Sequence, residues 1–348
     1  MTIRTADQLR DFTARILRAA GADQRNAERV AQALVGANLC GVDTHGVWHL
    51  PGYVQAIREG QLLPTAWPSI IEESPAYARV AGGWTFGHVG AEVAMELALD
   101  KAATTGIALV SLVQAHHIGR LGEYAEMAAE RHMVGLIWAG GFAEKEPVAM
   151  PYGGSRPVLH TNPLAMGFPA NSEPSVVLDF ATTVLSGVKV VEARTQGKEL
   201  PPGAIADREG RPTTDPEEFF KGGGHLPFGG HKGWGLMLAA ELLGRVFTGA
   251  DAFAQAPRGG PIFGHTGTTM VAFRADLFQP LTEYAGRTDE LEQRVRAVPP
   301  APGYAEVLVP GDLEARTRQI RLREGIPIPD DLWGRLRELA HSLGVETG

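Results

Sequence analysis

The feature that most constrains the fold is an abrupt change in hydrophobic pattern along the chain. Apolar residues recur at helical spacing over 5–35 and again over 331–343, and residues 312–324, which end before Gly325, are also expected to be helical. Thr5 followed by Gln8 forms a capping-box pattern, which predicts where the first helix begins. Both ends of the chain are therefore predicted to be helical.

The middle of the chain differs, because strand patterns alternate there with helical ones. Residues 107–113 and 134–139 are β-rich runs with few charges, separated by a helical repeat. This pattern predicts an α/β (α+β) protein with two parts. A helical domain would be built from both termini, residues 1–77 plus 296–348, beside a central α/β cofactor-binding domain, residues 78–295.

The composition is typical of a globular protein and excludes several partners. Hydrophobic residues make up 44% of the 348 positions and charged residues 21%. The net charge of −8 disfavours nucleic acid and anionic membranes, because both need clustered Lys and Arg. With one cysteine, Cys40, no disulfide can form within the chain, and the N-terminus shows no signal peptide. We therefore expect a soluble, cytoplasmic protein.

Common motifs for nucleotide and metal sites are absent. There is no G-x-G-x-x-G, no G-x-x-x-x-G-K-[ST], no H-E-x-x-H and no G-x-S-x-G. One cysteine excludes a thiolate zinc site, and the eleven histidines show no ligand-spaced motif, so no metal site is predicted. A nicotinamide cofactor would have to bind outside a Rossmann fold.

Two histidine segments could carry acid–base chemistry. Hydride transfer to a carbonyl needs a proton donor, and histidine suits this role because its pKa lies near neutrality. His117 lies in a His-His-Ile-Gly sequence at a predicted strand end, although a histidine pair can equally tie loop backbone together. His45 lies in a turn, where a lone histidine is more often structural. If the next residues are helical, His45, His49 and Tyr53 share one face.

Two further segments could hold an anionic cofactor. Residues 178–183 offer Asp179 to a ribose and a threonine hydroxyl to a carboxamide or phosphate, although an Asp that caps the next turn fits equally well. Residues 229–235 are glycine-rich and precede an apolar helix, so backbone amides, the helix dipole and Lys232 would face one anion. A flexible loop with a solvated lysine is the alternative, which so much glycine before a buried helix disfavours.

Taken together, these segments resemble the type-2 malate/L-lactate dehydrogenase family. The matching segments are collinear and span nearly the whole chain. They are GVDTHG at 41–46, LPGY at 50–53, HHIG at 116–119, TNPLA at 161–165, LDFAT at 178–182, KGWGL at 232–236 and VPGD at 309–312. The resemblance implies a non-Rossmann nicotinamide-binding fold with a central mixed or antiparallel sheet. It also implies NAD or NADP as the cofactor, a small carboxylate substrate and a homodimer.

The resemblance further implies roles for individual residues. His117 would be the catalytic acid/base, with His45 as a second proton donor. The substrate pocket would be lined by Thr44, His49 and Tyr53. The cofactor would be contacted by Val177, Leu178, Asp179, Phe180, Ala181, Thr182, Thr183, Thr161, Asn162, His231, Lys232, Pro310, Gly311 and Asp312.

Three departures from the family pattern fall beside the expected pocket. His49 stands where the family usually has an Arg that is expected to grip the substrate carboxylate, and a histidine is shorter and can be neutral. His160 stands where the family has a glycine. Residues 139–147 replace an Asn-containing turn and are one residue longer. These changes leave the predicted fold intact and the substrate open.

We therefore expect an NAD(P)-dependent oxidoreductase that transfers a hydride between nicotinamide and C2 of a small 2-oxo or 2-hydroxy acid. A reductase of cyclic imino acids (piperideine- or pyrroline-2-carboxylate) is the closest alternative, and His49 does not decide between them. A relative that binds the cofactor without turnover is a second alternative. The presence of both His45 and His117 argues against it, while His49 and the altered loop at 140–147 leave it open.

Overall fold

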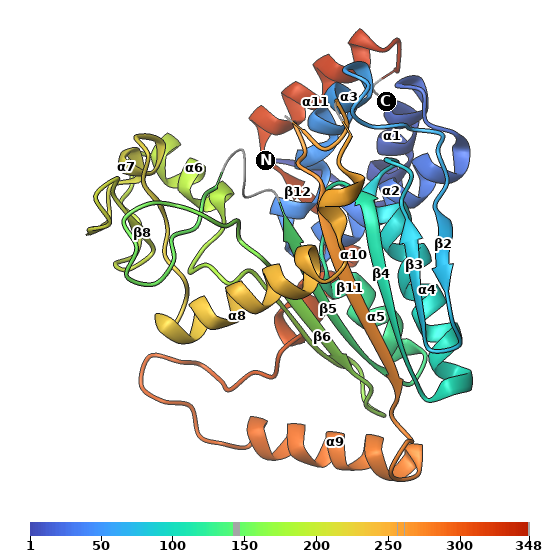
Figure 1. Ribbon diagram of the computed structural model, residues 1–348. Coiled ribbons are helices and arrows are strands. Elements are labelled where there is room, and N and C mark those ends of the chain that lie inside the picture. Colours follow the sequence, from blue (N-terminus) through green and yellow to red (C-terminus); the bar gives the residue numbers. More distant parts are fainter. Residues whose placement is uncertain (142–146, 256, 261, 347–348) are drawn as a thin grey trace.

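A seven-stranded sheet forms the centre of the computed structural model, which describes residues 1–141, 147–255, 257–260 and 262–346 (Figure 1). The strand order is β2-β3-β4-β11-β5-β6-β7, and β3 and β4 are parallel while the other neighbours are antiparallel. The strands are β2 (Ser69–Glu73), β3 (Tyr77–Ala81), β4 (Ile107–Ala115), β5 (Met133–Gly141), β6 (Leu164–Phe168), β7 (Val176–Phe180) and β11 (Thr266–Arg274). This confirms the predicted α/β class with a mixed sheet, which differs from the parallel sheet of a Rossmann fold.

Helices cover both faces of this sheet. On one face, α4 (Gly87–Thr105) packs against β4 and β11, and α5 (Gly122–Glu130) packs against β5 and β6. The other face contacts α8 (His231–Glu241) and the π-helical turn η3 (Leu242–Val246). Strand β5 contacts helices on both of its faces. A Cβ at Gly135 would meet side chains of α4 and α5, whereas a Cβ at Gly140 would meet Glu241 of α8. Strand positions of opposite parity face opposite sides.

The two ends of the chain pack together beside the sheet. β1 (Thr2–Arg4) pairs antiparallel with β12 (Ile326–Ile328), and Thr5 and Gln8 form the predicted capping box. The helices here are α1 (Ala6–Ala19), α2 (Gln24–Leu39), α3 (Leu50–Arg58), α10 (Asp312–Glu324) and α11 (Asp330–Ser342). The core shared by α1, α2, α3 and α11 also contains Phe86, Val89 and Phe263, which come from the predicted central domain. The domain boundaries at 77/78 and 295/296 therefore stay a prediction.

A small lobe stands apart from the main sheet, and no sequence pattern predicted it. It holds the three-stranded sheet β10-β8-β9 around a core of Val190, Leu200 and Ile205. Its elements are α6 (Gly187–Thr195), β8 (Ile205–Ala206), β9 (Pro212–Thr213), α7 (Pro216–Phe220) and β10 (Gly224–His225).

Helix α9 (Leu281–Arg296) lies along the edge of the molecule away from the N-terminal helices, and residues 297–311 lead back to α10 (Figure 1). Among the helices of the described residues, none combines the length and the apolar character needed to cross a membrane.

Candidate active site

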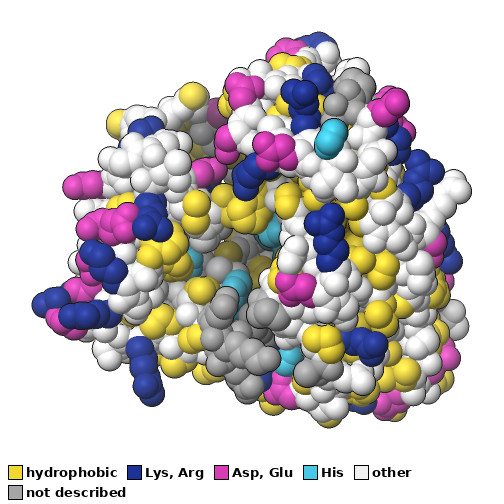
Figure 2. Space-filling view, turned by 90° about the horizontal axis from the view of Figure 1, so that it is seen from above, with side chains coloured by type: hydrophobic (Ala, Val, Ile, Leu, Met, Phe, Trp, Pro, Cys, Tyr) yellow, Lys and Arg dark blue, Asp and Glu magenta, His cyan; other side chains and the backbone are white. Residues whose placement is uncertain are grey.

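The candidate active site lies where the N-terminal helices meet the end of strand β4. His117 follows β4 in the chain, and its ring is partly exposed. Two short 3-10 turns, η1 (Asp43–His45) and η2 (Val47–His49), carry two further rings, and α3 carries Tyr53. Histidine side chains are visible in a recess of the surface (Figure 2). The structure thus brings His45, His49 and Tyr53 together with His117.

These residues do not share one continuous helix, because the backbone is extended at Gly46. Its φ and ψ are −88° and −152°, between the two turns. Asn38 fills the space beside it, since a Cβ at Gly46 would lie 2.3 Å from Asn38 Oδ1. That oxygen also accepts a hydrogen bond from Val47 N at 3.0 Å. The helical interpretation of 45–53 is therefore replaced by two turns and the start of α3.

A short hydrogen-bonded chain runs through His117. Its Nε2 lies 3.0 Å from His45 Nδ1, and its Nδ1 lies 2.7 Å from the hydroxyl oxygen of Tyr53. The ring of His49 packs beside that of His117 at a centroid distance of 4.4 Å. Phe263 stacks on Tyr53 at 4.8 Å and provides an apolar wall. Each ring nitrogen of His117 therefore has a polar partner within hydrogen-bond distance.

Burial keeps the three imidazoles neutral. It lowers the pKa of His45 to about 4, with a further lowering from the charge of Arg120. It lowers the pKa of His49 to about 3 and that of His117 well below its usual value. The same burial raises the pKa of Tyr53 well above its ordinary range. At neutral pH the pocket thus holds neutral rings that can accept a proton from a substrate hydroxyl.

The two histidines at the end of β4 differ in their surroundings, and each fits one of the two roles predicted for the pair. His116 is fully buried, and its Nε2 lies 2.9 Å from the backbone oxygen of Gln61, so it ties the loop in place. His117 faces the pocket instead. Gly119 has a φ of +81°, and a Cβ there would lie 2.5 Å from His88 Nε2, so the turn requires glycine.

Asp179 supports a helix in this structure. Its Oδ2 accepts a hydrogen bond from Gly122 N at 2.7 Å, at the start of α5, and lies 3.9 Å from Arg120 Nε. Burial raises the pKa of this carboxyl to about 6. Asp179 thus caps a helix far away in the sequence, and not the turn that follows it. Its predicted contact with a ribose stays a prediction.

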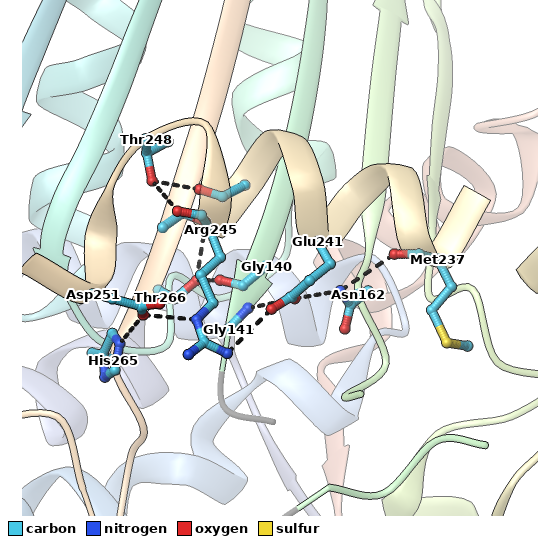
Figure 3. Close-up of polar contacts among 12 residues, drawn as sticks. Gly140, Gly141, Asn162, Met237, Glu241, Arg245, Thr248, Asp251, His265 and Thr266 are labelled. Atoms are coloured by element: carbon cyan, nitrogen blue, oxygen red, sulfur yellow. Dashed lines mark hydrogen bonds and ion pairs between the residues drawn. The ribbon is translucent and has the colours of Figure 1, made fainter. Parts of the chain in front are cut away.

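A polar network beside the sheet holds Asn162 (Figure 3). Asn162 has a φ of +39°, and its Nδ2 donates to Glu241 Oε2 at 2.7 Å. The same oxygen accepts from Gly141 N at 3.0 Å, and Arg245 pairs with both Glu241 and Asp251. The buried Oδ1 of Asn162 has no partner among the described residues. Sequence reasoning missed Glu241, because a lone acidic residue in an apolar helix carries no motif.

The other predicted cofactor residues lie in three places. Val177, Leu178 and Phe180 are in β7, Ala181 follows it, and Thr161 precedes β6. Thr182 donates to Thr161 O at 2.8 Å, and Thr183 donates to Leu185 O at 3.0 Å. Pro310 and Gly311 precede α10, while the carboxylate of Asp312 is already bound by Arg296 and by Val309 N. Of the altered segment 139–147, residues 142–146 lie outside the described part of the chain.

The start of α8 is suited to an anion. Gly229 and Gly230 have φ values of +57° and +63°, and no side chain in the described part of the chain caps the helix. His231 and Lys232 form its first turn and are exposed. Free amides at a helix N-terminus beside a cation favour a negatively charged group.

The sequence profile of malate/L-lactate dehydrogenase matches residues 4–337. The chain belongs to the malate/L-lactate dehydrogenase family. The L-sulfolactate dehydrogenase of Methanocaldococcus jannaschii is 34% identical over 332 residues, which is 95% of this chain and 94% of that protein. The malate dehydrogenase of Pyrococcus abyssi is 33% identical over 347 residues, which is 98% and 94% of the two chains.

A solved structure of the same family supports the fold, and its name refers to a cyclic imino acid as the substrate. The Δ1-piperideine-2-carboxylate reductase of Pseudomonas syringae superimposes with a TM-score of 0.86 at 29% identity and covers 98% of this chain and 100% of that one. The predicted family and reaction class are confirmed: this protein is a dehydrogenase that acts on the CH–OH group of 2-hydroxy acids. Such a family implies a nicotinamide cofactor.

The residues present fit such a cofactor. The unpartnered Asn162 Oδ1 is a buried acceptor for an amide donor, and the uncapped start of α8 offers amides to a diphosphate. Arg120 was not predicted as a site residue. It is nevertheless the buried cation whose charge acts on His45, held by Glu126 at 2.7 Å.

Proposed function

We propose that this protein interconverts a small 2-oxo acid and its 2-hydroxy acid with NAD(H) or NADP(H), and that His117 transfers the proton. The observation that carries the proposal is the chain from His45 through His117 to Tyr53, with contacts of 3.0 and 2.7 Å. A bound nicotinamide would take up or supply the hydride at C2 of the substrate.

The proposed proton transfer uses the neutral state of His117. In the oxidative direction its Nε2 accepts the hydroxyl proton, and the substrate oxygen takes the place of His45 as the partner of that nitrogen. Tyr53 holds the other ring nitrogen and fixes the orientation of the imidazole. In the reductive direction the protonated ring returns the proton to the oxygen at C2. Phe263 and the buried Tyr53 limit the access of water.

The proposed cofactor site joins the end of β7 with the start of α8. Asn162 would meet the carboxamide, and His231 and Lys232 would meet the phosphates. Residues 177–183 and 310–312 would complete the site through their backbone and hydroxyl groups, because the carboxylates of Asp179 and Asp312 are bound within the protein. His49 and Thr44 would border the substrate.

We also propose a homodimer. Several large apolar side chains of α8, η3 and the residue after η3 are 40–61% exposed, and a cluster of exposed apolar side chains of this size is typical of a protein interface. They are Leu236, Leu238, Leu242, Val246 and Phe247. Light scattering on the purified protein tests this directly, since a monomer at micromolar concentration would contradict it.

Cyclic imino acids are the second candidate substrates. The likeness to a Δ1-piperideine-2-carboxylate reductase structure favours this reading. Reduction of a C=N bond needs the same hydride geometry, and the imine nitrogen then occupies the place of the 2-oxo oxygen.

Oxidation of NADH and NADPH in the presence of a substrate panel tests both candidates. The panel contains pyruvate, oxaloacetate, sulfopyruvate, longer 2-oxo acids and the five- and six-membered cyclic imines. Turnover of an oxo acid supports the main proposal, and turnover of the imines alone replaces it with the second. Cofactor binding without turnover of any compound would contradict both and indicate a non-catalytic relative.

A further inference from the structure

Three histidine rings converge in the recess of the candidate active site. One ring nitrogen each of His45, His49 and His117 lies within 4.8 Å of the other two. We propose that these three histidines bind a divalent transition-metal ion of the Zn²⁺ class, and that the bound ion inhibits the enzyme. The binding half stands apart from the proposed function, whereas the inhibition half rests on it.

The distances are close to those of a zinc site. Zn–N bonds of about 2.0–2.1 Å put two ligand nitrogens of a tetrahedral site about 3.3 Å apart. His45 Nδ1 and His117 Nε2 are already 3.0 Å apart. His49 is partly exposed and is the last residue of the short turn η2, so a small ring movement closes the remaining distance.

The outer nitrogens of two rings have the partners that metal ligands use. His117 Nδ1 lies 2.7 Å from the Tyr53 hydroxyl oxygen, and the His49 ring forms a hydrogen bond with the backbone of Thr44. A histidine that donates its outer N–H to an oxygen has its other nitrogen free as a lone pair. These contacts orient the lone pairs of His117 and His49 away from Tyr53 and Thr44.

Three imidazoles leave one tetrahedral position open. Sites with three protein ligands and an open position bind water or an anion there. Neutral rings do not offset the charge of the ion, and the charge of Arg120 acts on His45 as well. An anionic fourth ligand is therefore favoured, and a 2-hydroxy acid offers both a carboxylate and a hydroxyl oxygen.

The ion and the proposed proton transfer compete for one lone pair. Metal coordination at His117 Nε2 occupies the nitrogen that accepts the substrate proton. Zn²⁺ should therefore lower turnover, and a chelator should restore it.

Metal titration of the full-length protein, free of any histidine tag and stripped with chelator, tests the binding half. Calorimetry with Zn²⁺ and visible absorption with Co²⁺ are measured for wild type, His49→Asn, Tyr53→Phe and His341→Gln. His341 is an exposed histidine of α11 and serves as the matched control.

We expect one equivalent of metal per chain and the absorption of a tetrahedral Co²⁺ site. His49→Asn should weaken binding by roughly 100-fold or more, and Tyr53→Phe by about 10–100-fold through loss of the outer hydrogen bond. His341→Gln should bind as wild type does. Binding that is absent, or that is unchanged in His49→Asn, overturns the proposal.

Turnover in the presence of Zn²⁺ tests the inhibition half. Each protein is compared with its own metal-free rate, and a Zn²⁺-dependent loss of turnover that is much larger in wild type than in His49→Asn supports it. Full turnover with metal bound overturns inhibition but leaves binding established. Failure of the proposed function is recognised separately, because the metal-free protein would then turn over none of the panel while still binding the ion.

Discussion

The four polar side chains of the candidate active site come from short segments that the sequence marked one by one. HHIG at 116–119 and GVDTHG at 41–46 pointed to His117 and His45, and helical spacing added His49 and Tyr53. Their partners were not readable, because the 3.0 Å contact between His45 and His117 joins positions 72 apart in the chain. Arg120 and Glu241 escaped for the same reason, since their importance lies in contacts rather than in a motif.

Replacing His117 tests the proton transfer at this scale. His117→Gln should lower kcat by roughly two to four orders of magnitude, the usual loss for a positioned acid/base, while the cofactor Kd changes little. Steady-state kinetics and fluorescence titration of the reduced cofactor measure the two quantities. His341→Gln is the control, and near-wild-type turnover in His117→Gln would remove this residue from the mechanism.

The proposed function places His49 beside the substrate. His49→Arg supplies a permanent cation with a two-pronged donor, so kcat/KM for ordinary 2-oxo acids should rise by roughly 10–100-fold. The variant should also lose the proposed metal site, because a guanidinium does not coordinate. Kinetics with pyruvate and oxaloacetate measure the first effect. An unchanged or lower kcat/KM would show that His49 belongs to another binding mode.

At the scale of elements, long helices were predicted well and short strands were not. The helix expected over 312–324 coincides with α10, and the apolar repeat over 331–343 is α11 shifted by one residue. Strands β8, β9 and β10 have two residues each, too few for any alternation to appear. They form because the lobe buries Val190, Leu200 and Ile205, which is a tertiary effect.

Substitutions at two glycines of α8 distinguish the effect of close packing from that of helix propensity. A Cβ at Gly233 would lie 1.8 Å from Phe228 O, whereas a Cβ at the exposed Gly235 would meet no described residue outside its own helix backbone within 4 Å. Gly233→Ala should therefore displace the loop before α8 and weaken cofactor binding. Gly235→Ala should stabilise the protein by about 0.5–1 kcal/mol, because alanine favours helices. Cofactor titration and thermal unfolding of both variants check this, and equal effects would contradict it.

For the molecule as a whole, buried neutral histidines make stability depend on pH. Burial lowers the pKa of His45, His160 and His225 from 6.5 to about 4. Between these values the unfolded chain binds more protons than the folded one, so stability rises with pH in this window. Acidification from pH 6.5 towards 4 should therefore lower the free energy of unfolding, most simply measured by urea denaturation.

His225 offers a direct test of this linkage. It is fully buried against Phe219 at a centroid distance of 4.6 Å, and its ring nitrogens have no partner among the described residues. His225→Phe removes one titrating group, so the stability lost between pH 6.5 and 5 should shrink by about 2 kcal/mol. An identical pH slope in wild type and variant would show that folding does not lower the pKa of His225.

The sequence by itself determined the family and the mixed α/β class, and it marked His117 as the residue proposed here for proton transfer. These depend on local periodicity and on short collinear motifs, which are properties of neighbouring residues. Only the tertiary structure decided what each motif residue touches. In the structure, Asp179 accepts a hydrogen bond at the start of α5, and Asp312 pairs with Arg296. Three histidines lie together in one recess, although their spacing in the sequence matches no metal-ligand motif. The reason is physical: hydrogen bonds and metal ligands depend on distance in space, which a one-dimensional pattern does not encode.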